Sequence, residues 1–178
     1  RKNPLHAKIS KKELLTSKIK EKKTWHIEID LVDSGMEFTP GDSLAVFPEN
    51  DPNLVNELLQ VLNFTGDEIV VTPSKNETNL RNALTKDYAI TTPDKKLLNA
   101  AADKANNSTL KELLSPENKK ELIDYLWGRE VIDIILENPS AKFSADEFVG
   151  LLKKLNVRLY SIASSLSHSP NQVDLTVA

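Results

Sequence analysis

The segment "VRLYSIASS", residues 157–165, carries a guanidinium and a phenol two residues apart. In an extended chain, side chains two residues apart point to the same face, about 7 Å from each other. Arg158 and Tyr160 would then share one face of a strand. A guanidinium offers a planar fork of donors to phosphate oxygens, and a phenol offers a flat surface for stacking. The pair therefore suits a ligand with a phosphate part and an aromatic part, such as a nucleotide or a flavin.

Ser161 adds a hydroxyl that can donate or accept a hydrogen bond at the edge of a ring. On an ideal strand this hydroxyl faces away from Tyr160. It can reach the same ligand only if the strand ends or twists sharply at Ser161, and the following Ala163-Ser164-Ser165 permits that. From spacing alone, an Arg-x-Tyr pair is more often solvent-facing or part of a cross-strand contact, so the ligand interpretation needs further support.

Other chemistries find little support in the composition. The chain has 178 residues and no cysteine, which excludes disulfides, thiolate catalysis and cysteine-ligated metal. Its three histidines lack metal-ligand spacing, and we expect no metal site. No Gly-x-Gly-x-x-Gly, phosphate loop or Gly-x-Ser-x-Gly occurs. A net charge of −3 argues against nucleic acid or an anionic membrane as a partner.

The N-terminal stretch has no apolar core of a signal peptide, and no apolar run approaches the ~18 residues that span a bilayer. Together with the absence of cysteine, this predicts a cytoplasmic protein.

Strand-like patterns occur at both ends of the chain. "TWHIEIDLV" places Trp25, Ile27 and Ile29 on one face, in the period-two alternation of a half-buried strand. "TPGDSLAVFP" predicts a turn at Pro40-Gly41. A second, short strand follows it and ends at Pro48, because proline cannot donate to a ladder. "RLYSIAS" and "QVDLTVA" predict two more near the C-terminus.

The middle of the chain has the apolar spacing of helices. Asp51 and Pro52 suit the start of the first helix. Further helices are expected from Thr92-Pro93, from Ser115-Pro116 and across 131–136. Ser144 with Glu147 forms a capping box, and apolar residues continue that pattern to Leu155. The strands at the two ends then form a discontinuous β domain with a helical insertion. Such a sheet is unfinished and leaves an unpaired edge, so we expect a piece of a longer polypeptide.

Several segments resemble the diflavin reductases of the ferredoxin–NADP reductase superfamily. "RLYSIASS" is similar to the flavin motif Arg-x-Tyr-Ser of that superfamily. "NPLHAKISKKELLT", "HIEIDLVDSGMEFTPGDSLAVFPENDPNLVNELL", "LLKKLNVRLYSIASS" and "NQVDLTVA" resemble the group in order along nearly the whole chain. The similarity is greatest to the sulfite reductase flavoprotein type, with the NADPH–cytochrome reductases also close. Val157 departs from the pattern, since proline commonly precedes this arginine.

The resemblance implies an α+β fold, in which a partial antiparallel β-barrel that binds FAD is interrupted by a mainly α-helical connecting domain. Residues 1–50 and 156–178 would form the barrel, and residues 51–155 the connecting domain. The resemblance implies that Arg158 holds the FAD pyrophosphate and that Tyr160 stacks on the isoalloxazine or its ribityl side. Ser161 would lie near the hydride-accepting nitrogen, which is the catalytic position, and Leu159 would contribute its backbone. The other implied FAD-binding residues, on the next strand, are Thr176, Val177 and Ala178.

The resemblance also implies groups and partners outside this segment. The parent enzyme would pass electrons from NADPH through FAD to FMN, with a flavodoxin-like FMN domain before Arg1 and an NADPH domain after Ala178. A haem-protein subunit is an expected acceptor. Because the second flavin motif of the family would also follow Ala178, we expect this segment alone to be inactive and to bind FAD only weakly.

Two alternatives stay open at this stage. The chain could be a non-enzymatic helical interaction module that keeps the barrel strands as a scaffold, although a scaffold does not need an arginine and a tyrosine in "RLYS". The parent could also be a single-flavin NADPH reductase without an FMN domain. The sequence leaves the final electron acceptor and the oligomeric state undetermined.

Overall fold

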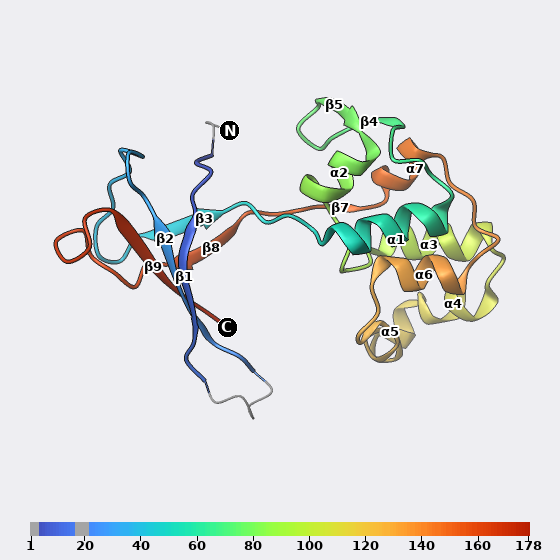
Figure 1. Ribbon diagram of the computed structural model, residues 1–178. Helices are drawn as coiled ribbons and strands as arrows, with labels where there is room; N and C mark the ends of the chain where they lie inside the picture. Colours follow the sequence, from blue (N-terminus) through green and yellow to red (C-terminus); the bar gives the residue numbers. More distant parts are fainter. Residues whose placement is uncertain (1–3, 17–21) are drawn as a thin grey trace. The chain divides into compact units, whose positions relative to one another are not determined.

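The computed structural model describes residues 4–16 and 22–178 (Figure 1). Residues 1–3 and 17–21, which belong to the expected β segment 1–50, lie outside the described part. The chain divides into two compact units, one of residues 1–47 with 157–178 and the other of residues 48–156. Strands build the first unit and helices dominate the second. The expected α+β class is confirmed.

The first unit has five strands in its described part, all paired antiparallel. They are β1 (Ile9–Leu14), β2 (Trp25–Asp30), β3 (Ser43–Val46), β8 (Arg158–Ser161) and β9 (Gln172–Val177). β2 lies between β1 and β9 in a three-stranded sheet, and β3 pairs with β8 in a separate ribbon (Figure 1). The strand predicted at "RLYSIAS" is therefore present as β8, although it is shorter than the pattern indicated.

The alternation in β2 sets which face of the three-stranded sheet is apolar. Ile27 lies opposite Leu175 on β9, and Ile29 lies opposite Val173. Leu175 and Val173 are both buried. Because a shift of one residue would turn this whole set toward solvent, burial of the apolar face holds the register.

The strands of the first unit do not form a closed barrel among the described residues. β1 and β3 each pair with a single neighbour, so each leaves an edge without a strand partner. One isolated β-bridge, between Ile162 and Leu175, joins the ribbon to the sheet among the described residues. Closure needs a partner at every edge, and the expected partial barrel is observed only as this open arrangement.

The second unit consists of short helices with two small β pairs. Its helices are α1 (Pro52–Leu62), α2 (Leu80–Lys86), α3 (Lys95–Lys104), α4 (Ser108–Leu113), the 3₁₀ helix η1 (Pro116–Asn118), α5 (Lys119–Leu126), α6 (Val131–Glu137) and α7 (Ala145–Gly150). Its strands are β4 (Ile69–Val71), β5 (Glu77–Asn79), β6 (Tyr88–Ala89) and β7 (Lys153–Lys154). None of the helices in the described part has the length and apolar character needed to cross a membrane.

The start of α1 agrees with the sequence prediction. The Asp51 side chain accepts a hydrogen bond from the Asn53 backbone N–H, and Pro52 is the first helical residue. Leu58 and Leu59 lie on the buried face of the helix, within the larger apolar core of the unit. Each fully buried leucine contributes about 2 kcal/mol to folding. α1 ends at Leu62, and the next residue, Asn63, adopts the left-handed conformation common at helix ends.

The predicted extension of the last helix to Leu155 is wrong. α7 ends at Gly150, and Lys153–Lys154 form β7, which pairs with Tyr88–Ala89. The Leu155 N–H donates to the Asp87 carbonyl at 2.8 Å. Leu151 and Leu152 still pack on the core. Their apolar spacing was therefore a true burial signal but not a helical one.

Two helices, α2 and α4, have no counterpart in the sequence prediction. They are only seven and six residues long. Each begins at an asparagine whose side chain accepts a backbone hydrogen bond: Asn79 from Asn82, and Asn107 from Leu110. These caps were present in the sequence, but helices this short give few apolar positions from which a period can be recognised.

Asn50 explains why the first unit stops at Phe47 rather than at the expected residue 50. Its side chain is buried, and its Nδ2 donates to the carbonyls of Leu84 at 2.6 Å and Tyr88 at 2.7 Å. Its backbone N–H donates to Thr85 at 2.9 Å. Since Leu155 is bonded to Asp87, both ends of the helical unit are attached to residues 84–88.

Replacing Asn50 with Ala should lower the free energy of unfolding of the helical unit by about 2 kcal/mol, because two buried carbonyls lose their donor. Urea unfolding followed by circular dichroism at the helical minimum measures the change. Asn99→Ala is the matched control, since Asn99 also donates to a carbonyl but is exposed. Equal losses in the two variants would contradict a special role for Asn50.

Candidate functional site

β8 and its pairing with β3 determine where Arg158 and Tyr160 point. Arg158 lies opposite Val46, and Tyr160 lies opposite Leu44. Residues directly opposite each other in an antiparallel pair share a face. Arg158 and Tyr160 therefore lie on the same face of the ribbon. Arg158 is exposed, whereas Tyr160 is half-buried.

Leu159 and Ser161 occupy the opposite face of β8. Leu159 pairs with Ala45 and is 72% exposed. β8 ends at Ser161, and the chain then changes its hydrogen-bond partner. The Ile162 N–H donates to the Asp42 carbonyl at 3.0 Å, and the next N–H, that of Ala163, donates to Asp174 on β9 at 2.8 Å. The Ser161 hydroxyl can reach a ligand on the face of Tyr160 only if the strand ends at Ser161. β8 does end at Ser161.

The bridge between Ile162 and Leu175 places the candidate residues 176–178 beside the end of β8. In the antiparallel register of this bridge, Ser161 lies beside Thr176. Thr176 is exposed and pairs with His26 across β2. Val177 follows in β9, and Ala178 comes directly after that strand. The structure therefore joins the two segments at Ser161 and Thr176, with Arg158 about 10 Å further along β8 by the rise per residue.

Arg158 differs from the other arginines of the described part in having no partner. Arg81 donates to Asn56, and Arg129 forms an ion pair with Glu137 at 2.9 Å. No hydrogen bond or ion pair joins the Arg158 side chain to any residue in 4–16 or 22–178. An exposed guanidinium without a partner keeps all five donors available for an anionic ligand.

Tyr160 differs from the other tyrosines in the same way. The Tyr88 hydroxyl donates to the Val71 carbonyl at 2.8 Å. The Tyr125 hydroxyl donates to Glu137, and burial together with that carboxylate raises the pKa of Tyr125 to about 12. The Tyr160 hydroxyl and the Ser161 hydroxyl have no hydrogen-bond partner among the described residues. The face of β8 thus carries polar groups that its own fold leaves unused.

A turn over residues 39–42 holds the start of β3, in agreement with the turn that the sequence predicts at Pro40-Gly41. The Asp42 carboxylate accepts from the Thr39 N–H at 2.8 Å and from its hydroxyl at 3.1 Å. Gly41 has a φ of +98°, which side-chain-bearing residues rarely adopt. Because Asp42 also accepts from Ile162, this turn positions both strands of the ribbon.

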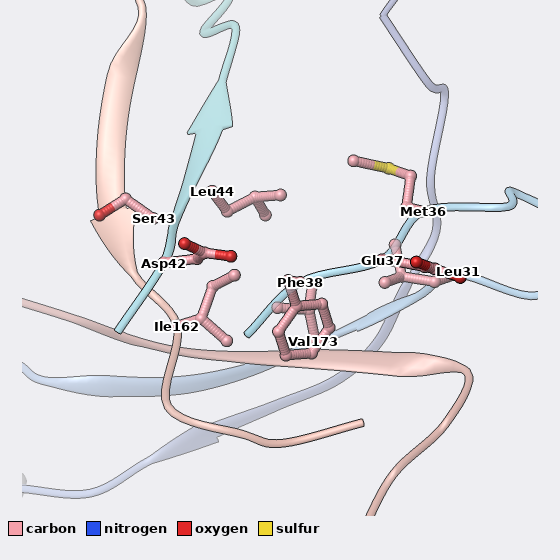
Figure 2. Close-up of a pocket in the computed structure, with 9 residues that line it drawn as sticks. All are labelled: Leu31, Met36, Glu37, Phe38, Asp42, Ser43, Leu44, Ile162 and Val173. Carbon is pink, nitrogen blue, oxygen red and sulfur yellow. The ribbon is translucent and has the colours of Figure 1, made fainter. Parts of the chain in front are cut away.

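A small hollow lies in the first unit, lined by residues of both the sheet and the ribbon. Its volume is about 160 Å³, and Figure 2 shows Leu44 and Ile162 pointing into it from one side, with Phe38 and Val173 facing them. The other lining residues are Leu31, Met36, Glu37, Asp42 and Ser43. This volume is below the range of about 300–1,000 Å³ of ligand pockets. We interpret the hollow as imperfect packing between the sheet and the ribbon.

A wider hollow of about 420 Å³ lies beside the end of β8. It is lined by Pro40, Gly41, Ile162, Ala163, Ser164, Ser165, His168 and Asp174. Neither hollow includes Arg158 or Tyr160. The face that carries these two residues is therefore an open surface, on which a ligand would lie across the ribbon.

Charged side chains on β1 and β2 lie near Thr176. His26 Nε2 is 3.0 Å from Glu28 Oε1, and Lys11 Nζ contacts both Glu13 at 3.0 Å and Glu28 at 3.5 Å. The hydrogen bond and the attraction of Lys11 lower the pKa of Glu13. Among residues 4–16 and 22–178, no cluster of His, Asp and Glu is arranged to hold a metal ion.

Comparison with known proteins identifies a matching family and relatives that share one name. A family model described as "FAD binding domain" matches residues 1–178. The sulfite reductase [NADPH] flavoprotein alpha-component of Bacillus subtilis is 42% identical over 178 residues, which cover 99% of this chain and 29% of that protein. The component of the same name from Zymomonas mobilis is 38% identical over 175 residues, covering 98% of this chain and 28% of that protein. The chain thus spans less than a third of the length of these relatives.

Gly41→Ala should destabilise the first unit by about 1 kcal/mol, because a side chain is strained at this φ even though nothing lies within 4 Å of the added methyl. Trp25 fluorescence in a Trp127→Phe background reports unfolding of this unit alone. Gly150→Ala adds a methyl in equally open space without a positive φ, so its stability, followed by circular dichroism, should not fall. A Gly41→Ala variant as stable as its parent would show that the turn tolerates a side chain.

Proposed function

The chain belongs to the FAD binding domain family, and from this we propose that it is the FAD-binding and connecting segment of an NADPH-dependent diflavin oxidoreductase. In the whole enzyme, electrons pass from NADPH through FAD to FMN and then to an acceptor, such as the haem-protein subunit of sulfite reductase. The observation that carries the proposal is the unpartnered Arg158 and Tyr160 on one face of β8. The sulfite reductase flavoproteins, at 38–42% identity, support this class of enzyme.

The donor set of β8 fits FAD. The planar fork of Arg158 matches two oxygens of the pyrophosphate, and a charge-assisted pair of this kind is among the stronger hydrogen-bond arrangements. The half-buried ring of Tyr160 offers its face to the isoalloxazine or its ribityl side. Bound FAD supplies the acceptance of hydride and the release of single electrons, while the protein supplies binding, orientation and electrostatics.

The remaining candidate residues complete this arrangement. The Ser161 hydroxyl donates a hydrogen bond near the hydride-accepting nitrogen, which makes it the candidate catalytic residue. Leu159 contributes its backbone, since its side chain points to the other face. Thr176, Val177 and Ala178 hold the flavin or its adenine end through their backbone. The adjacency of Ser161 and Thr176 in the bridge register supports one continuous binding strip.

We assign the helical unit, residues 48–156, as the connecting domain. It stands in the sequence between β3 and β8, the two strands of the proposed flavin ribbon. Its role is to position a flavodoxin-like FMN domain against FAD. That FMN domain and an NADPH domain would belong to the same parent chain, with a haem-protein subunit as the acceptor.

FAD titration of the chain tests the proposal. We expect a dissociation constant in the micromolar range or weaker, and Arg158→Ala should remove binding, because charge-assisted hydrogen bonds to the pyrophosphate are lost. Leu159→Ala is the matched control on the same strand, and its affinity should stay within about twofold, since the backbone contact remains. Equilibrium dialysis with FAD measures all three proteins.

The outcomes separate the alternatives. Unchanged affinity in Arg158→Ala would exclude this arginine from the pyrophosphate role. Nanomolar affinity of the unaltered chain would contradict the expectation that essential contacts are missing. No binding at millimolar FAD would instead favour the non-enzymatic helical module.

Stacking by Tyr160 has its own optical test. A stacked phenol quenches flavin fluorescence by donating an electron to the excited ring, so the unaltered chain should quench bound FAD. Tyr160→Phe should keep a similar affinity but quench less, because its ring is not readily oxidised. Tyr160→Ala should also quench less and bind about fivefold more weakly, given the roughly 1 kcal/mol value of an aromatic pair. Quenching that survives in Tyr160→Ala would place another group against the ring.

A further inference from the structure

The strands of the first unit carry four hydroxyl side chains in the described part of the chain, on Ser10, Ser43, Ser161 and Thr176. Ser10, on β1, donates a hydrogen bond to the Glu28 carbonyl at 3.2 Å. The hydroxyls of the other three residues are exposed, and none of them has a hydrogen-bond partner among the described residues. These three hydroxyls therefore keep their donor and acceptor capacity for a ligand.

The three unpaired hydroxyls lie in one row across three neighbouring strands. Ser43 is directly opposite Ser161 in the β3–β8 ladder, and Ser161 lies beside Thr176 in the register of the bridge to β9. Residues opposite each other share a face, and neighbouring strands are about 5 Å apart. Figure 2 shows the Ser43 side chain directed to the other side of β3 from Leu44. We call Ser43, Ser161 and Thr176 the hydroxyl row.

The hydroxyl row has a defined end on each side. Beyond Ser43, β3 has no second strand partner among the described residues. Beyond Thr176 lies His26 on β2, whose Nε2 is 3.0 Å from Glu28 Oε1. Because that imidazole already contacts a carboxylate, the run of unpaired groups stops at Thr176. The row is thus uncharged and extends over two strand spacings, about 10 Å.

Such a row suits an uncharged ligand edge on which acceptors and donors alternate. A hydroxyl can donate one hydrogen bond and accept others, so it can meet either a carbonyl oxygen or an N–H. The flavin ring has an edge of this kind, with two carbonyl oxygens on either side of an N–H. Adenine has no carbonyl, and nicotinamide has a single carboxamide. A site whose hydroxyls bond this edge discriminates against rings that lack it, because its polar groups are then left unpaired.

We propose that Ser43 and Thr176 flank Ser161 as specificity-determining residues, whose side chains hydrogen-bond the polar edge of the flavin ring. This inference rests on the proposed function, which places Ser161 near the hydride-accepting nitrogen beside that edge. Thr176 then contributes its hydroxyl in addition to its backbone. Ser43 joins the site from the other side of the helical unit in the sequence, through its pairing with Ser161.

Equilibrium dialysis of the 178-residue chain with FAD and with ADP tests the hydroxyl row. ADP keeps the two phosphates but lacks the flavin ring, so its binding should depend on Arg158 and not on the row. Ser43→Ala and Thr176→Val should each weaken FAD binding about fivefold, as expected for one neutral hydrogen bond, and leave ADP binding unchanged. The double variant should lose the product of the two factors, because the two hydroxyls are two strand spacings apart.

Matched variants control for damage to the fold. Ser43→Thr and Thr176→Ser keep the hydroxyls and should bind FAD as the unaltered chain does. Ser10→Ala makes the same change on β1, where the hydroxyl is already bonded to the Glu28 carbonyl. Its affinity for both ligands should stay the same.

Two results would overturn the proposal: an FAD affinity that either Ser43→Ala or Thr176→Val leaves unchanged, or an equal loss for FAD and ADP, which would report a damaged fold. If FAD binding depends on Arg158 but not on the hydroxyl row, the proposed function stands and the row is rejected. If the chain binds neither FAD nor ADP, both are rejected.

Discussion

The antiparallel pairing of β3 with β8 determines where every candidate side chain on β8 points. This ladder joins segments from opposite sides of the helical unit in the sequence, and its register sets Arg158 and Tyr160 on one face and Leu159 on the other. The turn at residues 39–42 holds one end of the ladder, because Asp42 bonds both Thr39 and Ile162. Beyond that point the chain transfers from β3 to β9. The ladder keeps β8 extended, and an extended strand places the guanidinium and the phenol on the same face.

A long insertion between two paired strands needs its ends held close. In the helical unit, Asn50 and Leu155 are both attached to residues 84–88, through a buried amide and a backbone hydrogen bond. Contacts within the helical unit therefore hold its two ends close together. The entropy cost of closing this long loop is offset within the unit and not by the β3–β8 ladder. Buried hydrogen bonds suit this role, because an unpaired carbonyl in the core is costly.

The structural polar groups and the candidate functional ones differ in whether their side chains have a hydrogen-bond or ion-pair partner among the described residues. Arg129, Tyr125 and Glu137 satisfy one another, and their interactions hold the turn after α5. Arg158 and Tyr160 have the same functional groups but no partner among the described residues. This difference supports the proposed role of Arg158 and Tyr160 in ligand binding.

The amino-acid sequence determined the local features: the alternation of Trp25, Ile27 and Ile29, the cap of α1 at Asp51, and the residue types of "RLYS". These follow from neighbours along the chain, whose spacing is visible in the sequence. The tertiary structure decided the rest. Pairing with β6 turned Lys153–Lys154 into a strand where apolar spacing had predicted a helix, and buried contacts of Asn50 moved the boundary of the helical unit. The bridge of Ile162 with Leu175 placed Ser161 beside Thr176. Strand pairing and burial depend on residues distant in sequence, and no local pattern encodes which of them meet.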